Sequence, residues 1–338
     1  MRMITEILPI NEESLKKAKE LLLGGGLVAF PTETVYGLGA VAYDDAAVKK
    51  IYEVKGRPAD NPLIVHVHKD YDITSLVTVE HDYALKIAKA FLPGPITIVY
   101  KSNGKVSPTV SCGLDTLAVR IPESSAAQEF LRYVNQPIAA PSANISKHVS
   151  PVTAMHVYKD FNGKIPLILD GGKCSGGIES TVLDATGEVP VILRKGLITA
   201  EMVAEVTGEC LYAKDVCTKE ARSPGMKYTH YCPNTNTALF ERDDVKNAVL
   251  LYDEYVNSGK NPVFLTDGEM ALKVENRKVE LLGNTAEQMA SNLYDKLRSL
   301  EKYDLIISFK LNVDCELMLS VDNRFQKAFG RSVNINKK

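Results

Sequence analysis

Residues Ala29 to Ala40 read AFPTETVYGLGA, and this stretch determines how the first half of the chain is interpreted. The apolar run LVAF before it predicts a buried strand. The glycines match the G-x-G-x-x-A pattern of a dinucleotide-binding loop, but six residues separate the strand from Gly37. Lys55-Gly-Arg57 stands about twenty residues on, where an acidic ribose ligand is expected. We therefore interpret Gly37 and Gly39 as letting the backbone pack closely around a pocket.

Length and composition indicate a globular protein of two domains. The chain has 338 residues, of which 45% are hydrophobic and 24% charged, and its formal charge is −2. That charge argues against a protein that coats nucleic acid by bulk electrostatics. Six cysteines without a C-x-x-C pair signal neither a zinc site nor a disulfide framework. No signal peptide or membrane-spanning stretch is evident, so we expect a cytoplasmic location.

Strands and helices alternate along residues 1–208, which favours an α/β domain with a mixed sheet. Within it we predict strands at 27–30, 63–67, 96–100, 116–121, 138–144, 166–170, 180–185 and 189–194, and helices near 11–23, 44–54, 80–91 and 124–134. Residues 209–235 lose this periodicity and carry the basic and aromatic stretch SPGMKYTHYCP. Residues 236–338 return to alternating strands and helices, which predicts a second, smaller α/β domain.

Two cations lie on the loop KGRPADNP at 55–62. Pro58 and Pro62 restrict this loop, so Lys55 and Arg57 are held two residues apart at low entropic cost. Paired cations of this kind suit a polyphosphate, and the alternative is an ordinary solvated loop.

Other polar residues stand at the ends of predicted strands. Arg120 ends an apolar strand, and a buried guanidinium needs an anion, either a protein carboxylate or a ligand carboxylate. His66 lies in the apolar run LIVHV, which is typical of a core histidine unless its strand end faces a cleft. Further candidates are the hydroxyl, amide and basic side chains of Ser142, Asn144, Ser180, Thr181, Arg194 and Lys195.

Together these segments supply cations, hydroxyls and glycines but no nucleophile beside a base, which indicates binding of anions. H-E-x-x-H and G-x-S-x-G are absent, and no paired acids suit glycoside hydrolysis, so hydrolytic classes are disfavoured.

Several ordered motifs resemble the YrdC-type threonylcarbamoyl-AMP synthases. They are AFPTETVYGLG, KGRPADNPLIVH, LPGPITIV, GLDTLAVRIP, PIAAPSANISKHVSP, GIESTVLD and VILRKG, spanning residues 10–205, and the rest of the chain resembles the longer, two-domain form. The resemblance implies a twisted mixed sheet with helices around a concave basic cavity, and a smaller Rossmann-like α/β C-terminal domain. We expect a catalytic domain at 1–208, a linker or lid at 209–235 and a C-terminal domain at 236–338.

The resemblance also implies a reaction. L-threonine, bicarbonate and ATP would give threonylcarbamoyl-AMP and pyrophosphate, for threonylcarbamoyladenosine modification of tRNA by a downstream tRNA threonylcarbamoyl transferase. Because the substrate amine can capture carbon dioxide as a carbamate, the nucleophile comes from the substrate and no catalytic serine or cysteine is needed. We expect Mg²⁺ to be carried by the ATP phosphates, with no metal site on the protein.

The resemblance assigns site residues as follows. L-threonine would be held by Thr32, His66, Arg120, Ala140 and Ser180, with Arg120 as the partner of its carboxylate. ATP would be surrounded by Lys55, Arg57, Thr116, Ser142, Asn144, Ser150, Arg194, His230 and Tyr231. Lys55 and Arg57 would be the catalytic cations, and His230 and Tyr231 would belong to a lid.

One alternative is an RNA-binding module that uses the same basic cavity without ATP chemistry; direct tRNA binding stays open. The slightly acidic chain and the lack of stacking aromatics beside basic residues in the first domain argue against it. Another alternative is a carbamoyltransferase of the hydrogenase-maturation kind, whose zinc-finger cysteines this sequence lacks.

Overall fold

A computed structural model describes residues 3–213 and 231–330 of the chain. It divides the chain into two compact units. Unit 1 comprises Met1–Ser146 and Ser150–Tyr228, and unit 2 comprises Lys147–Val149 and Thr229–Lys338. Three residues from the middle of the first predicted domain thus belong with the second unit.

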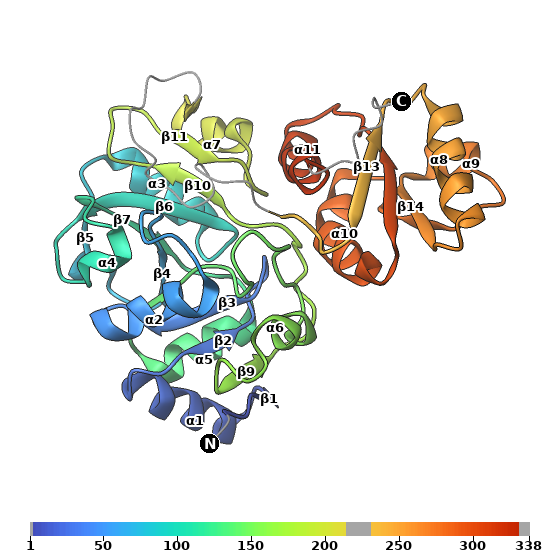
Figure 1. The fold of residues 1–338 in the computed structure, drawn as a ribbon. Coiled ribbons are helices and arrows are strands. Elements are labelled where there is room, and N and C mark those ends of the chain that lie inside the picture. Colours follow the sequence, from blue (N-terminus) through green and yellow to red (C-terminus); the bar gives the residue numbers. More distant parts are fainter. Residues whose placement is uncertain (1–2, 214–230, 331–338) are drawn as a thin grey trace. The chain divides into compact units, whose positions relative to one another are not determined.

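The described strands of unit 1 form one mixed sheet (Figure 1). Its order is β1-β9-β2-β3-β8-β4-β7-β6-β10-β11-β12, with β5 beside β6. The strands are β1 (Glu6–Pro9), β2 (Val28–Phe30), β3 (Gly37–Val41), β4 (Ile64–His66), β5 (Val77–Thr78), β6 (Ile96–Ser102), β7 (Thr116–Arg120), β8 (Ile138–Ala140), β9 (Leu167–Asp170), β10 (Thr181–Asp184), β11 (Val191–Arg194) and β12 (Leu211–Tyr212). Parallel pairs such as β4 with β7 alternate with antiparallel pairs such as β6 with β7, which confirms the predicted mixed sheet.

Helices pack around this sheet, and α1 contacts α5 while α2 contacts α4. They are α1 (Glu12–Leu23), α2 (Asp45–Lys55), α3 (Asp82–Phe91), α4 (Pro108–Ser111), α5 (Ser125–Val134), α6 (Ala154–Phe161) and α7 (Ala200–Thr207), with a short 3₁₀ helix at Ile73–Ser75.

Local capping explains where the predicted helices begin and end. Asn11 Oδ1 accepts a hydrogen bond from the Ser14 N–H, and Ser14 Oγ accepts one from the Asn11 N–H, so α1 begins with a capping box. Asp44 caps α2 in a similar way, and Gly56 ends that helix in the left-handed conformation, with φ of 59°. This glycine separates Lys55, the last residue of α2, from Arg57.

The stretch that opened the sequence analysis forms a β-hairpin. Its two glycines lie in strand β3, which pairs antiparallel with β2 and β8 and which we did not predict. A Cβ atom on Gly37 would lie 3.1 Å from the Phe30 ring, and one on Gly39 would lie 2.7 Å from Cγ2 of Ile138. The glycines therefore serve close packing of a strand, and the dinucleotide loop is excluded.

The main core of unit 1 lies between this hairpin and helices α1 and α5. Phe30 packs on Phe130 with ring centroids 4.9 Å apart. The fully buried side chains of this cluster come from α1, β2, α5, β8 and β9, and include Leu15, Leu22, Val28, Leu131, Ile138 and Leu167.

Unit 2 is built on a parallel sheet of four described strands in the order β13-β16-β14-β15. The strands are β13 (Asn236–Phe240), β14 (Pro262–Thr266), β15 (Val279–Leu281) and β16 (Leu305–Phe309), and the helices are α8 (Val245–Asn257), α9 (Gly268–Lys273), α10 (Ala286–Ser299) and α11 (Glu316–Ala328), with a 3₁₀ turn at Leu300–Lys302. Helices α8 and α9 cover one face, and α10 and α11 the other (Figure 1). This arrangement confirms the predicted Rossmann-like α/β domain.

Among the described helices, none is long and apolar enough to cross a membrane.

We predict that Gly39→Ala lowers the free energy of unfolding of the full-length chain by about 1–3 kcal/mol, because the added methyl overpacks Ile138 and Phe30. Urea unfolding followed by far-UV circular dichroism measures this change. Gly187→Ala is the matched control, since its added Cβ would meet only one atom, at 3.8 Å. Equal urea midpoints for the two variants would contradict the packing argument.

Candidate active site

The loop between β2 and β3 is tied to strand β7 by a buried ion pair. Arg120 Nη2 donates to Glu33 Oε1 at 2.6 Å, and Arg120 Nη1 donates to Thr34 Oγ1 at 2.8 Å. The side chains of Arg120 and Glu33 are only 4% and 8% exposed. A buried guanidinium with a carboxylate partner holds the loop against the end of the strand.

This pair answers the question that the sequence left open about Arg120. The anion beside it in the structure is a protein carboxylate, from Glu33, whose role we did not predict. The Nε atom of Arg120 is buried and has no hydrogen-bond partner in the described part of the chain. One donor of the guanidinium therefore stays available for a ligand carboxylate, and contact with threonine stays a prediction.

Thr32 uses its hydroxyl within its own loop. Oγ1 donates to the Val35 carbonyl oxygen at 2.7 Å and accepts from the Thr34 and Val35 N–H groups at 3.2 and 3.3 Å. It also lies 2.9 Å from Thr34 Oγ1, so Thr32, Thr34 and Arg120 form one chain of hydrogen bonds. The Thr32 hydroxyl thus stabilises the loop, and its contact with L-threonine stays a prediction.

His66 is the register neighbour of Arg120, because β4 and β7 run parallel with His66 opposite Arg120. Its Nδ1 lies 3.1 Å from the Ile64 carbonyl oxygen, and its ring packs edge-on against Phe30. Burial, together with the positive charge of Arg120, lowers the pKa of His66 to about 3. The imidazole is therefore neutral at physiological pH.

The side chain of Lys55 is almost fully buried and joins two segments. Its Nζ donates to the Ser142 carbonyl oxygen at 2.6 Å and also to the Asn144 carbonyl oxygen. The Ser142 hydroxyl donates to Asn144 Oδ1 at 2.5 Å. The structure thus brings three predicted ATP residues together at the C-terminal end of α2.

Arg57 and Arg194 form a second basic group. Arg57 Nη2 donates to the carbonyl oxygens of Asn61 and Pro62 at 3.2 and 3.3 Å, while its buried Nε has no partner in the described part of the chain. Burial lowers the pKa of Arg57, and the nearby charge of Arg194 lowers it further. A bound anion would stabilise the charged form of Arg57.

Ser180 connects this basic group to the predicted threonine residues. The Ser180 carbonyl oxygen accepts from Arg194 Nε at 3.1 Å, and its hydroxyl lies 2.8 Å from Thr97 Oγ1. Ser180 immediately precedes β10, which pairs parallel with β6.

The remaining predicted residues of unit 1 are less directly connected. The buried Ser150 hydroxyl donates to Glu179 Oε1 at 2.7 Å. Ala140 lies opposite Ile64, two residues from His66 in the register. Thr116 begins β7 whereas Arg120 ends it, so these two residues are separated by four strand steps, or about 13 Å. A ligand that reaches both must be extended.

The predicted lid is only partly described. His230 and residues 227–229 lie outside the described residues. Tyr231 belongs to unit 2, where it is buried and stacks on Tyr294 with ring centroids 5.4 Å apart. The Tyr231 ring therefore packs within unit 2, and a contact of Tyr231 with ATP stays a prediction.

Sequence reasoning missed the acidic and hydroxyl partners of the site. Glu33 and Thr34 lie within the quoted motif AFPTETVYGLGA, but nothing in it says that they face Arg120. Glu179 and Thr97 likewise pair with Ser150 and Ser180 only through the fold.

Cys174 is buried near Thr32 and Glu33, and burial raises the pKa of its thiol to about 12. The thiol of Cys174 is thus protonated and a poor nucleophile.

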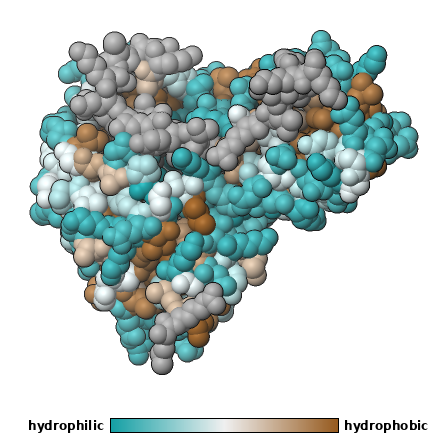
Figure 2. Space-filling model, viewed as in Figure 1, coloured by the Kyte–Doolittle hydropathy of each residue, from teal (hydrophilic) through white to brown (hydrophobic). Residues whose placement is uncertain are grey.

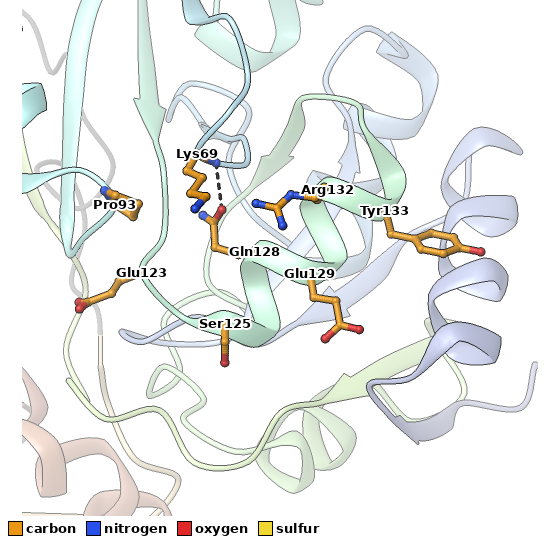
Figure 3. Close-up of a pocket in the computed structure, with 8 residues that line it drawn as sticks. All are labelled: Lys69, Pro93, Glu123, Ser125, Gln128, Glu129, Arg132 and Tyr133. Atoms are coloured by element: carbon orange, nitrogen blue, oxygen red, sulfur yellow. Dashed lines mark hydrogen bonds between the residues drawn. The ribbon is translucent and has the colours of Figure 1, made fainter.

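A cavity of about 650 Å³ in unit 1 lies elsewhere (Figure 3). Its lining residues are Lys69, Pro93, Glu123, Ser125, Gln128, Glu129, Arg132 and Tyr133, none of which was a candidate. The Lys69 N–H donates to Gln128 Oε1 at 2.9 Å, as the dashed line in Figure 3 marks. Figure 2 shows a mainly hydrophilic surface with small apolar groups on the visible face.

Among residues 3–213 and 231–330, no three histidine, cysteine or acidic side chains converge as metal ligands. Basic side chains do suit the phosphate oxygens that carry Mg²⁺ with a nucleotide.

The fold of unit 1 and its basic strand-end site define an α/β protein of the YrdC class. Residues 20–196 match the Sua5_yciO_yrdC family model, described as "Telomere recombination". Residues 198–330 match the Sua5_C model, described as "Threonylcarbamoyl-AMP synthase, C-terminal domain".

Whole-chain relatives agree with these matches. The threonylcarbamoyl-AMP synthase of Pyrococcus abyssi is 41% identical over 95% of each chain, and that of Bacillus subtilis is 41% identical over 98% of this chain and 97% of the relative. A crystal structure of P. abyssi Sua5 complexed with L-threonine covers 98% of each chain, at 40% identity and a TM-score of 0.85. The chain belongs to the threonylcarbamoyl-AMP synthase family and is an enzyme of that family.

We predict a pH dependence of stability that arises from His66. Its folded-state pKa of about 3 lies below the ordinary value of 6.5, so below pH 6.5 the unfolded chain takes up a proton that the folded chain does not. This stabilising contribution is complete above pH 6.5 and is lost progressively as the pH falls towards 3.

His66→Gln removes this titration. Between pH 6.5 and 5, urea unfolding of the wild type should lose roughly 1.5 kcal/mol more than that of the variant. Parallel pH profiles for the two proteins would contradict a neutral, buried His66.

Proposed function

We propose that this enzyme condenses L-threonine, bicarbonate and ATP to threonylcarbamoyl-AMP and pyrophosphate. The amine of threonine and bicarbonate give a carbamate with loss of water. A carbamate oxygen then forms a bond to the α-phosphorus of ATP, and the bond from that phosphorus to the departing pyrophosphate breaks. The family membership and the threonine complex of the P. abyssi relative support this proposal.

The observation that carries the proposal is the buried guanidinium of Arg57, whose Nε has no hydrogen-bond partner in the described part of the chain. A buried cation with an unused donor makes a site that an anion stabilises. The β- and γ-phosphates are the most highly charged part of ATP, and charge grows on them as pyrophosphate leaves. Preorganised cations lower the barrier to such a step because they need no rearrangement at the moment of reaction.

Lys55 has a different task in this proposal. Its Nζ is shared between the carbonyl oxygens of Ser142 and Asn144, so it both shapes the segment 142–144 and places a positive charge beside it. The Ser142 hydroxyl and the Asn144 amide would then orient the nucleotide. The other proposed ATP contacts are Ser150, Thr116, Arg194, His230 and Tyr231.

L-threonine would bind at the ends of β4 and β7. Arg120 Nε supplies a donor for the carboxylate, while Glu33 and Thr34 fix the guanidinium plane. Neutral His66 adds no positive charge beside Arg120, so it does not compete for the same carboxylate. Thr32, Ala140 and Ser180 are the other proposed contacts.

ATP is proposed to enter as its Mg²⁺ complex, with the metal on phosphate oxygens. The product, a mixed anhydride, would pass to a downstream tRNA threonylcarbamoyl transferase, because such an anhydride hydrolyses readily in water. The alternative of an RNA-binding module would show salt-sensitive tRNA binding without ATP turnover.

The direct test incubates the full-length protein with ATP, bicarbonate, Mg²⁺ and labelled threonine, and identifies the product by mass spectrometry. We expect threonylcarbamoyl-AMP together with one pyrophosphate for each product molecule. Tight tRNA binding without this product would favour the alternative.

We predict that Lys55→Ala and Arg57→Ala each lower kcat/KM for threonine-dependent pyrophosphate release by at least about 100-fold, because each removes a cation from the phosphate site. Arg132→Ala is the control. Its guanidinium pairs with Asp70 at 2.9 Å and is 53% exposed, so its loss should change kcat/KM by less than about twofold. Unchanged turnover in both site variants would refute the assignment.

A further inference from the structure

The short helix α4 supports the loop that carries Arg57. Residues 56–63, here called the Arg57 loop, join α2 to β4, and α4 packs against α2 (Figure 1). At the end of the loop, the Leu63 N–H donates to the Val110 carbonyl oxygen of α4 at 2.8 Å. The loop and both helices lie within unit 1, so their contacts are internal to one compact body.

The hydroxyl of Tyr52 lies where the Arg57 loop meets α4. Tyr52 belongs to α2 and is only 6% exposed. Its hydroxyl donates to the Asn61 carbonyl oxygen in the loop at 3.1 Å and to the Thr109 carbonyl oxygen in α4 at 3.2 Å. Cys112 Sγ lies 3.5 Å from the same hydroxyl. Because a hydroxyl has one proton, the two carbonyl oxygens share it, and the side chain joins three segments.

The Tyr52 hydroxyl keeps its proton at physiological pH. Burial raises its pKa well above the ordinary value of 10, since the phenolate form would lose its hydration. The group is therefore a permanent donor to these carbonyl oxygens.

Arg57 donates to the same oxygen that Tyr52 holds. Its Nη2 lies 3.2 Å from the Asn61 carbonyl oxygen and 3.3 Å from that of Pro62. A carbonyl oxygen has two lone pairs, so it can accept from both the hydroxyl and the guanidinium. Asn61 is only 3% exposed, and water therefore has little access to replace either donor. The position of this oxygen sets the position of the guanidinium.

Asp45 holds the other end of the support. Its Oδ1 accepts from the Ser107 and Thr109 hydroxyls at 2.5 and 2.6 Å, which fastens the N-terminal end of α4 to α2. Tyr52 follows Asp45 by seven residues, about two helical turns, so both side chains project from the same face of α2. Helix α4 is thus bonded to this face at two levels, through the hydroxyl and the carbonyl oxygen of Thr109.

We propose that Tyr52 is a positioning residue for Arg57. It contacts neither substrate, and it acts by holding the Asn61 carbonyl oxygen on which the guanidinium rests. The inference rests on the proposed function, because that function assigns Arg57 to the phosphates of ATP. A guanidinium held in place before reaction stabilises the departing pyrophosphate without first having to be ordered.

Tyr52→Phe tests this role, because it keeps the buried ring and removes only the hydroxyl. We expect kcat for threonine-dependent pyrophosphate release to fall about tenfold, while KM for threonine changes by less than about twofold. The split arises because Arg57 is proposed to act on the phosphates and lies outside the proposed threonine contacts. Steady-state kinetics of the full-length protein with ATP, bicarbonate and Mg²⁺ measure both constants.

A double-mutant cycle separates positioning of Arg57 from general loosening. In an Arg57→Ala background there is no guanidinium to position, so adding Tyr52→Phe should change the residual turnover by less than about twofold. Losses that multiply fully in the double variant would show that the two side chains act independently.

Tyr83→Phe is the matched control. It also removes a hydroxyl that donates to a loop carbonyl oxygen in unit 1, that of Gly187 at 2.6 Å, and should change kcat by less than about twofold. Circular dichroism establishes that each variant is folded. If Tyr52→Phe fails to fold, Asp45→Ala tests the same support and should lower kcat about threefold with an unchanged KM for threonine.

Two results would overturn the inference: an unchanged kcat in the folded support variant, or fully multiplicative losses in the double variant. Failure of the proposed function is distinct, because it would appear as a wild-type protein that forms no threonylcarbamoyl-AMP.

Discussion

The buried ion pair between Arg120 and Glu33 is the constraint around which the catalytic unit is organised. Arg120 lies at the end of β7, and its two terminal nitrogens donate to Glu33 and Thr34 of the loop 31–36. These bonds hold the loop against the end of the strand. Burial, and after it the positive charge of its register neighbour Arg120, lowers the pKa of His66 to about 3. The same pair leaves the buried Nε of Arg120 without a hydrogen-bond partner among the described residues, and this is the donor that we propose for the threonine carboxylate.

A second set of cations lies in the same unit and is organised differently. Lys55 donates to backbone carbonyl oxygens, and Arg57 Nη2 donates to the carbonyl oxygens of its own loop. These acceptors orient the two side chains, and a polyphosphate is the anion that we propose for them. The two proposed binding sites therefore differ. The proposed amino-acid site contains the ion pair of Arg120 with Glu33, and the proposed nucleotide site contains the cations Lys55 and Arg57.

The sequence indicated much of this organisation, and the misses have identifiable causes. Most strands and helices of both units lie within a few residues of where periodicity and capping placed them, as at Asn11 and α1. Strand β3 was missed because GLGAV has little side-chain pattern, and its glycines were explained only when Phe30 and Ile138 were seen beside them. The anion beside Arg120 stayed open because Glu33 is far from it in sequence. Proximity of residues 87 positions apart is a property of the sheet order.

The sequence by itself determined the two α/β units, the family and the list of basic and hydroxyl residues, because these follow from local periodicity and from short motifs. Only the tertiary structure decided which of those residues meet. It paired Arg120 with Glu33, it brought Lys55 to the carbonyl oxygens of Ser142 and Asn144, and it separated Thr116 from Arg120 by the length of a strand. It also grouped residues 147–149 with unit 2. The physical reason is that burial, strand register and long-range hydrogen bonds depend on how distant segments pack, and no local pattern records that.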